Sequence, residues 1–480
     1  MPSQTPVSAR CIRPSLSLAV IIGVLLQSGS LLGLAQTISP ADKAEARDIF
    51  AKVIAMNTAL GQGNVPALAQ ALAQRFTEAG FPSQDVHVLP FKDTANLVVR
   101  YRGTGQGGKP IALMAHMDVV AANRSDWQRN PFELIEENGY FFGRGTSDVK
   151  QEVALLSETF LRLKRAHFTP SRDLILVFSG DEETAQDSID DLVAHHRELV
   201  DAEFALNGDG GGGQLDDSTG AASVFYIQGA EKTSAGFKLT TENPGGHSSQ
   251  PRKDNAIYTI AKALNAIQAY RFPIKSNEWT VGEFKTSAAL TPGKLGQAMA
   301  QFAAHPTDAK AAAVIAEYPH TIGKVRTTCV ATLMQGGHAE NALPQHAEAT
   351  INCRIFPGTP ASEVAATLQK LAGPDVKVSM VYKPLESPPS PLRADVVQAV
   401  TDAVHLNYPA ATIIPTQAAY ATDGAVFRGY QIPTYGVGST FIKPSDEFAH
   451  GLNERIPVNT FYNGLRYWDR LIKNLAGGKP

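Results

Sequence analysis

Imidazole and carboxylate side chains follow four apolar runs of this 480-residue sequence. These residues are His116, Asp118, Asp181, Glu182, Glu183, Asp209 and His450. A further acid, Asp148, lies just after a glycine-rich turn at 143–145. Imidazole and carboxylate ligands without thiolate suit Zn2+, and Co2+ or Mn2+ can take its place. The residue types therefore predict a site for divalent metal, provided that the fold brings them together.

The number of acids in this set favours two metal ions. Carboxylates gathered in one cleft cost free energy through desolvation and repulsion unless cations compensate. Two ions about 3.5 to 4 Å apart need a carboxylate that bridges them, and such a pair polarises a carbonyl and generates hydroxide at neutral pH. A spare carboxylate must then act as the general base. The adjacent residues Glu182 and Glu183 can supply a ligand and a base.

Each of these motifs has a plainer interpretation when it is taken alone. An Asp-Glu-Glu run is usually a solvated turn, and a His-x-Asp pair usually has a structural role. The four-glycine loop 210–213 could be a flexible connection, and it lacks the Lys-Ser/Thr sequence that a phosphate-binding loop needs. A shared position at strand ends is what favours one common site.

Strand and helix patterns alternate over the first half of the chain. Short apolar runs predict strands at 96–101, 111–115, 174–178 and 204–207. Three- and four-residue apolar spacing predicts helices at 41–55, 65–79, 148–165 and 189–195. Such alternation predicts an α/β fold, with a mostly parallel sheet flanked by helices on both faces. The carboxyl ends of its strands form a crevice, so the side chains above should converge there.

The pattern changes near residue 232. It predicts strands at 237–241, 327–333, 348–355 and 376–382 and helices at 255–270 and 361–371, a smaller α+β unit in which 271–324 has no defined pattern. After a proline-rich segment, a helix at 394–404 and strands at 412–415 and 432–438 complete the first sheet. We therefore expect a first domain in two parts, 36–231 and 385–480, and an inserted domain at 232–384.

The N-terminus has the pattern of a targeting segment. No acidic residue precedes Asp42, and Arg10 and Arg13 stand ahead of the apolar run 16–26. This run has the length of a signal h-region and is shorter than the roughly 20 residues of a spanning helix. We expect residues 1–35 to be a cleaved signal peptide, and the mature protein to be secreted or periplasmic without stable membrane insertion. An uncleaved anchor is the alternative.

Bulk charge and cysteine content say little about partners. Lys and Arg number 43 and Asp and Glu 46, for a net charge of -3, which excludes a broadly basic protein that binds nucleic acid. Only Cys329 and Cys353 would remain after signal cleavage, and they flank the midpoint of a predicted hairpin near Asn341. A bridge is conceivable, but a chain of this size needs no disulfide framework, so two buried free thiols are the favoured interpretation.

Five strings of the sequence, in order, resemble the motifs of the M20 family of dinuclear zinc metallopeptidases, which includes glutamate carboxypeptidases, carnosine-type dipeptidases and aminoacylases. The strings are AHMDVV, GRGTSDVK, SGDEET, NGDGG and HGLNE. The resemblance implies a zinc-exopeptidase-like catalytic domain with an inserted lid or dimerisation domain. It implies Glu182 as the general base and Asp118 as the acid that orients the first histidine ligand. The metal ligands that it implies are His116, Asp148 as the bridging carboxylate, Glu183, Asp209 and His450.

The inserted domain carries further resemblance to the family. His247 in GGHSSQ resembles the histidine that stabilises the oxyanion, often across a dimer. Asn341 and Arg354 resemble the pair that grips the terminal carboxylate of the substrate, which a guanidinium can bind bidentately. The resemblance makes a homodimer through the lid possible. Together with the N-terminal signal, it predicts a secreted exopeptidase that hydrolyses dipeptides or short peptides with a two-metal-activated water.

Two other functions stay open from the sequence. The first is an N-acyl amino acid amidohydrolase of the aminoacylase type. Asp at position 209 is commoner among the family's dipeptidases and aminopeptidases, which favours peptide substrates. The second is a catalytically dead homologue that binds peptides, and the complete set of ligand and base residues argues against it.

Overall fold

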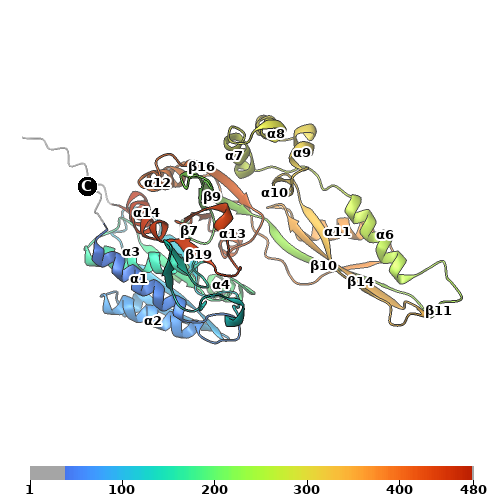
Figure 1. The fold of residues 1–480 in the computed structure, drawn as a ribbon, viewed down its shortest axis with the longest axis horizontal. Coiled ribbons are helices and arrows are strands. Elements are labelled where there is room, and N and C mark those ends of the chain that lie inside the picture. Colours follow the sequence, from blue (N-terminus) through green and yellow to red (C-terminus); the bar gives the residue numbers. More distant parts are fainter. Residues whose placement is uncertain (1–37, 478–480) are drawn as a thin grey trace, which may run out of the picture. The chain divides into compact units, whose positions relative to one another are not determined.

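The computed structural model describes residues 38–477, and its largest element is a ten-stranded sheet (Figure 1). The strands follow the order β1-β2-β6-β3-β7-β17-β9-β8-β18, and β16 pairs with β9. The strands are β1 (Val86–Phe91), β2 (Thr94–Tyr101), β3 (Ile111–His116), β6 (Leu174–Ser179), β7 (Phe204–Asn207), β8 (Gly212–Leu215), β9 (Ala222–Glu231), β16 (Thr412–Ala418), β17 (Thr434–Gly436) and β18 (Phe441–Ile442). At the centre of the sheet β6, β3, β7 and β17 run parallel, which confirms the predicted fold class.

Helices cover both faces of this sheet. The central strand β3 is buried along its whole length, and its alternate residues enter different cores: Ile111 and Leu113 face one, and Ala112 and Met114 face the other. The first core is closed by α1 (Pro40–Ala55), α2 (Val65–Glu78), α3 (Lys150–Arg165), α12 (Ala394–His405) and α14 (Val458–Ala476). The second is closed by α4 (Asp187–His195), α5 (Arg197–Val200) and α13 (Gly424–Gly429). The large sheet is thus the middle layer of three, between two layers of helices.

A second sheet of four strands has the order β12-β14-β10-β15. Its strands are β10 (Thr233–Glu242), β12 (Thr328–Gly336), β14 (His346–Ile355) and β15 (Lys377–Met380), with α6 (Ala256–Ala269) and α11 (Ala361–Ala372) packed on it (Figure 1). Only Lys232 separates β9 of the large sheet from β10 of the small one. The domain boundaries proposed from the sequence stay a prediction.

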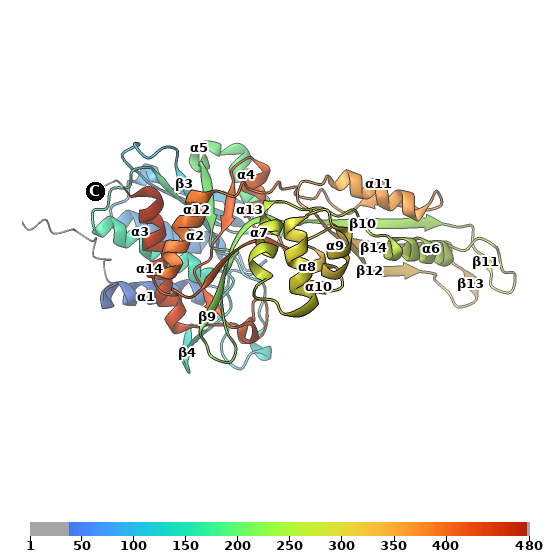
Figure 2. The ribbon, with the colours of Figure 1, turned by 90° about the horizontal axis from the view of Figure 1, so that it is seen from above.

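The segment without a sequence pattern, 271–324, folds into four helices, which lie together in Figure 2. They are α7 (Glu278–Ser287), α8 (Gly293–Ala304), α9 (Ala309–Ile315) and α10 (Pro319–Ile322). The helices α7, α8 and α9 share a small core of their own. Trp279 of α7, however, is buried in the core of the large sheet. Its indole N–H donates to the Ser390 carbonyl at 2.7 Å. Lys324 Nζ also binds Glu283 of α7 at 2.6 Å and the Gln417 carbonyl of β16 at 3.1 Å. This segment therefore packs on the large sheet.

The remaining elements are short. Two small sheets pair β11 (Gly246–His247) with β13 (Ala342–Leu343), and β5 (Tyr140–Phe142) with both β4 (Ile135–Glu137) and β19 (Arg455–Pro457). Three 3-10 turns are η1 (Ser83–Asp85), η2 (Arg124–Asp126) and η3 (Pro444–Asp446). Across residues 38–477 no helix combines the length and the apolar character that crossing a membrane requires. The predicted signal, 1–35, lies outside the described residues.

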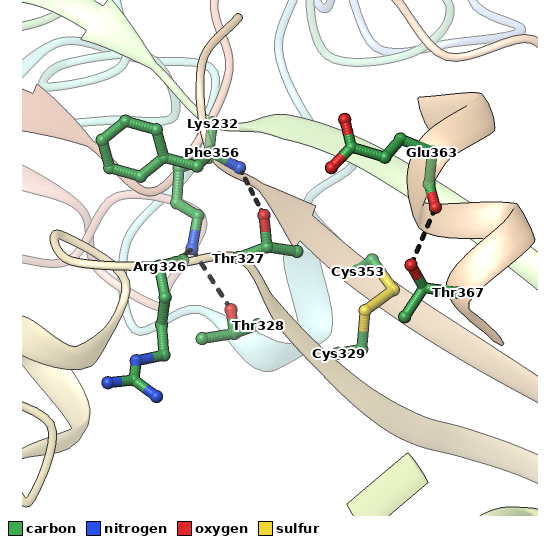
Figure 3. Close-up of a disulfide and its surroundings, with 9 residues drawn as sticks. All are labelled: Lys232, Arg326, Thr327, Thr328, Cys329, Cys353, Phe356, Glu363 and Thr367. Carbon is green, nitrogen blue, oxygen red and sulfur yellow. Dashed lines mark hydrogen bonds between the residues drawn. A yellow bond between two sulfur atoms is a disulfide. The ribbon is translucent and has the colours of Figure 1, made fainter. Parts of the chain in front are cut away.

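The prediction of two free thiols is wrong, because Cys329 and Cys353 form a disulfide (Figure 3). The two residues face each other directly in the antiparallel pair of β12 and β14, with their Cα atoms 4.1 Å apart. The sequence predicts the hairpin but leaves its register open, and register decides whether two side chains on neighbouring strands meet. The disulfide thus links β12 to the centre of the small sheet.

Candidate metal centre

Three neighbouring parallel strands place His116 and the predicted acids at one edge of the large sheet. β6, β3 and β7 lie side by side, and each is fully buried. His116 is the last residue of β3, Glu182 and Glu183 follow β6, and Asp209 follows β7. The side chains converge at the carboxyl ends of the strands, as the pattern predicts.

The His116 ring is buried and held in one orientation. Its Nδ1 lies 3.0 Å from the backbone carbonyl oxygen of Asp118, which can only accept, so Nδ1 carries a proton. Its Nε2 faces three carboxylates: Asp148 Oδ1 at 3.0 Å, Asp209 Oδ2 at 3.9 Å and Glu182 Oε2 at 4.0 Å. Burial alone would lower the pKa of His116, but the bond to Asp148 and the nearby carboxylates raise it well above its usual value. Nε2 is thus aimed at a strongly negative site.

Asp148 lies between two imidazoles. Its Oδ1 contacts His116, and its Oδ2 lies 3.1 Å from His450 Nε2, which is also 2.9 Å from Glu183 Oε2. Burial would raise the pKa of Asp148, but its bonds to the two histidines hold it below its usual value. The bonds to Asp148 and Glu183 raise the pKa of His450 to about 10. One carboxylate therefore contacts both imidazoles, with one oxygen beside each ring.

Asp118 contacts the loop that carries the two glutamates. Its carboxylate oxygens accept from the backbone N–H groups of Glu182 at 3.2 Å and Glu183 at 3.0 Å. Its Oδ1 is 3.6 Å from His116 Nδ1, farther than the backbone carbonyl of Asp118 itself. Burial raises the pKa of Asp118 to about 6. In this structure the Asp118 side chain positions Glu182 and Glu183, while its main chain orients His116.

Glu454, in the HGLNE string, has a role that the sequence did not reveal. This fully buried carboxylate accepts from the backbone N–H groups of Gly145 at 3.1 Å, Ser147 at 2.7 Å and Asp148 at 3.1 Å. Arg144 pairs with it at 2.6 Å. The only signal in the sequence is its place within a metal-ligand motif. The Asp148 loop is thus fixed to the segment that follows His450.

The geometry fits divalent metal. Two groups, His116 with Glu182 and Asp209, and His116 with Asp148 and Glu183, each offer three ligand atoms within 4.8 Å of one another. Glu183 Oε1 is buried and has no hydrogen-bond partner within residues 38–477. Burial and neighbouring carboxylates raise the pKa values of Glu182 and Asp209 well above their usual range, which reflects a shortage of positive charge. A metal ion would supply that charge, and oxygen and imidazole donors suit zinc.

A cavity of about 350 Å³ opens beside these groups. Its walls include Asp148, Glu182, Glu183, Asp209 and His450. The rest of the wall consists mainly of glycines and of residues from the C-terminal segment, namely Gly208, Gly210, Gly211, Gly212, Gly213, Tyr420, Thr422, Gly438, Thr440, Ile442, Glu447 and Ala449. The Tyr420 hydroxyl donates to Gln228 Oε1 at 2.9 Å, which fixes the ring at the cavity wall. The volume suits a small substrate.

The three residues that the sequence predicts in the inserted domain lie away from this cavity. None of His247, Asn341 and Arg354 lines this cavity. His247 of β11 pairs with Ala342 of β13, and the Asn341 carbonyl accepts from the N–H of Ser248 at 3.0 Å, so His247 and Asn341 are neighbours. Arg354 lies at the other end of β14 from His346, and eight residues of strand span about 26 Å. The structure therefore brings His247 and Asn341 together and leaves Arg354 apart from them.

Asp423 is a further buried acid near the site that the sequence did not reveal. It stands just before α13, and its Oδ2 accepts from the hydroxyl of Ser179 at the end of β6. Burial raises its pKa to about 7, an effect that the hydrogen bond to Ser179 opposes. No metal-ligand motif surrounds it, so only the tertiary structure shows its position.

Comparison with known proteins identifies relatives of this arrangement. The profile described as "Peptidase family M20/M25/M40" matches residues 112–474. The N-fatty-acyl-amino acid synthase/hydrolase PM20D1 of Homo sapiens is 27% identical over 391 residues, which cover 78% of this chain and 75% of that protein.

Solved structures share the fold. An M20 family metallo-carboxypeptidase, Sso-CP2 from Sulfolobus solfataricus, superposes with a TM-score of 0.66 at 18% identity, covering 90% of this chain and 99% of the other. The Bacillus subtilis YXEP protein, described as a dinuclear metal-binding peptidase from the M20 family, has a TM-score of 0.57 at 13% identity over 90% of this chain and 98% of its own.

Proposed function

The chain belongs to peptidase family M20/M25/M40, and on this basis we propose that it is an exported, metal-dependent exopeptidase that hydrolyses dipeptides or short peptides. The observation that carries the proposal is the position of Asp148. Its two carboxylate oxygens lie 3.0 Å from His116 and 3.1 Å from His450. A carboxylate with one oxygen beside each imidazole can bind two metal ions at once.

We assign the remaining ligands from their neighbours. His116 and Asp209 would hold one ion, His450 and Glu183 the other, and Asp148 both, with zinc the best match to these donors. When bound, such a pair polarises a substrate carbonyl and lowers the pKa of water. This set leaves Glu182 free for proton transfer.

Glu182 would act as the general base. Its Oε2 lies 4.0 Å from Nε2 of His116, one of the proposed ligands. From this position it can reach a water molecule or a leaving amine beside the metal ions. It would take a proton from the attacking water and pass it to the departing amino group. A Glu182→Ala protein should keep its metal and lose about 100- to 10,000-fold in kcat. Full turnover by that variant would contradict the assignment.

The charge on the cavity wall favours a substrate with a free amino group. Among the described residues no lysine or arginine lines the cavity. Apart from the proposed ligands and base, its acids are Glu152, which binds Ser439 and Trp468, and Glu447. The Glu447 side chain has no hydrogen bond or ion pair within residues 38–477. An α-ammonium group would be attracted to Glu447, whereas an uncharged N-acyl group would not.

Hydrolysis of N-acyl amino acids is the second candidate, because the relative PM20D1 carries that activity in its name. One experiment separates the two. The zinc-loaded mature protein is incubated with a mixture of dipeptides, longer peptides and N-acyl amino acids, and the cleaved bonds are identified by mass spectrometry. Cleavage of dipeptides or of terminal peptide bonds supports the proposal. Cleavage confined to N-acyl amino acids would replace it with the second candidate.

We also propose that the protein works as a homodimer. His247 and Asn341 stand about 26 Å or more along the small sheet from Arg354. If all three contact one substrate, they must come from two chains. Within residues 38–477 the outer strand β12 has no partner strand along one edge, and its exposed side chains include Val330, Leu333 and Met334. A second copy paired along this edge would cover these apolar groups.

Export is proposed from the N-terminal sequence and is supported by the disulfide. Cys329 and Cys353 are bonded, and structural disulfides persist mainly in oxidising compartments. N-terminal sequencing of the protein recovered from outside the cytoplasm should begin just after Ala35. An intact N-terminus on that protein would favour an uncleaved anchor.

A further inference from the structure

Gln186 connects the proposed general base to an acid from the C-terminal segment. Its side-chain Nε2 lies 3.2 Å from Glu182 Oε1 and 3.4 Å from Asp423 Oδ1. A primary amide nitrogen has two hydrogens, so one can be donated to each carboxylate. The residues joined in this way are 4 and 237 positions apart in the sequence.

The contact distinguishes the two oxygens of Glu182. Oε1 accepts from Gln186, while Oε2 is the oxygen that lies 4.0 Å from His116 Nε2. Within residues 38–477 no other side chain donates a hydrogen bond to the Glu182 carboxylate. The terminal torsion of a glutamate is soft, so a carboxylate without such a contact would rotate freely. Gln186 is therefore the protein group that sets the direction of the Glu182 oxygens.

Gln186 is itself held by its surroundings. Its backbone is in the left-handed region, with φ of 56°, and its N–H donates to the Asp181 carbonyl at 3.0 Å. Asp423 is almost fully buried, and its second oxygen accepts from Ser179 at the end of β6. A continuous path of hydrogen bonds thus runs from a rigid strand through Asp423 and Gln186 to Glu182. Because an amide does not titrate, this donor stays available at every pH.

We propose that Gln186 is a positioning residue, which holds Glu182 Oε1 so that Oε2 faces the metal ligands. This inference depends on the proposed role of Glu182 as the general base. A group that acts through the base should affect the chemical step and leave substrate binding unchanged. Catalysis is sensitive to displacements of about 1 Å in such groups.

The test uses Gln186→Gly, because glycine adopts a positive φ without strain and removes the whole side chain, including the amide that contacts both carboxylates. We expect kcat to fall about 10- to 100-fold, with KM within about twofold of the parent. Zinc content and thermal midpoint should not change. Gln186→Asn keeps an amide and tolerates the same backbone region, but it is one methylene shorter and should show a similar loss.

The matched control is Gln431→Gly. Gln431 is also a glutamine with a positive φ, 64°, but it is exposed and far along the chain from the proposed base. This variant should keep the parent kcat. Equal losses in the Gln431 and Gln186 variants would overturn the inference, because the loss would then reflect backbone effects.

Glu182 variants separate this inference from the proposed function. In a Glu182→Gln background, Gln186→Gly should cause no further loss, since its effect passes through Glu182. If Glu182→Gln itself keeps full kcat, the proposed function fails. If Glu182→Gln is inactive but Gln186→Gly keeps kcat within about twofold of the parent, only the positioning role is overturned.

Discussion

Arg144 and Glu454 form a buried ion pair at 2.6 Å that joins the loop of Asp148 to the loop of His450. Glu454 accepts from three backbone N–H groups of the first loop, and Arg144 Nη2 donates to the carbonyls of His450 and Gly451 at 3.2 Å each. One pair of side chains thus holds together the loop of Asp148, the proposed bridging ligand, and the loop of His450, a proposed ligand of the second ion. Residues that orient metal ligands in this way usually affect metal affinity strongly.

We therefore expect Glu454→Gln to lose metal more readily than the parent. The amide nitrogen of glutamine would face N–H donors, and the buried Arg144 would lose the negative charge that pairs with it. Zinc affinity, measured against a graded chelator, should fall about 10- to 100-fold. Unfolding free energy should fall by about 3 to 5 kcal/mol. Glu317→Gln, at an exposed pair with Lys294, is the control and should change neither quantity. Unchanged zinc retention in Glu454→Gln would refute the prediction.

Glu447→Gln should weaken the preference for a free amino group. Its carboxylate is exposed, so the attraction to an α-ammonium is partly screened. We expect kcat/KM for dipeptides to fall about two- to fivefold, and kcat/KM for the N-acetylated forms to stay unchanged. Measuring both substrates at low and high salt checks the electrostatic origin, since the dipeptide effect should shrink with salt. Equal losses on both substrates would mean that Glu447 acts on the cavity as a whole.

The strand ends of the site could be predicted from the sequence, because β3, β6 and β7 are buried on both faces and read as uninterrupted apolar runs. Residues next to such runs are placed by the backbone itself, and this is why His116 and Asp209 could be predicted to lie at one edge of the sheet; their roles as metal ligands were implied by the family resemblance. The helices α7 to α10 could not be predicted, because their apolar residues are divided between a small core of their own and, at Trp279, the core of the large sheet.

Contacts that depend on tertiary structure could not be predicted from the sequence either. The disulfide depends on the register of β12 and β14, which the hairpin pattern leaves open by one or two residues. Gln186 and Asp423 stand far apart in the sequence, and neither lies in a pattern that would connect them. Residue type and spacing are enough to propose the ligands, whereas the contacts that orient them depend on tertiary packing.

Lys232, between the two sheets, should make stability depend on pH. Burial and the nearby Arg354 lower its pKa to about 7, against 10.5 in the unfolded chain. Between these values the unfolded chain binds a proton that the native protein does not, so this residue makes the free energy of unfolding rise with pH from about 7 to 10.5. Below pH 7 the lysine is charged in both states, and its burial is then most costly.

Lys232→Met isolates this effect, since methionine does not titrate. The difference in unfolding free energy, parent minus variant, should increase with pH by at most about 1.4 kcal/mol per unit. Urea denaturation of both proteins at several values across that window measures it. A difference that is the same at every pH would show that Lys232 keeps an ordinary pKa in the folded protein.

The Cys329–Cys353 disulfide should contribute to stability and leave catalysis unchanged. It closes a loop with a sequence separation of 24, and loops of that size give about 3 kcal/mol when they are cross-linked. The double variant Cys329→Ala/Cys353→Ala should lose about that much in urea denaturation. Neither cysteine lines the cavity, so kcat should stay at the parent value. The reduced parent should match the variant, and a stable reduced protein would contradict the estimate.

The separation of His247 from Arg354 leads to a complementation test of the homodimer. His247→Ala and Arg354→Ala should each be nearly inactive, because every site in a symmetric dimer then lacks one of the two side chains. In a mixed dimer, one site receives both intact side chains and the other receives neither. Two different affinity tags allow the mixed dimer to be purified, and it should recover about half of the parent activity. Each variant dimerised with itself is the control and should stay inactive. A mixed dimer without activity would mean that His247 and Arg354 serve different sites. An active monomer would show that no site needs side chains from two chains.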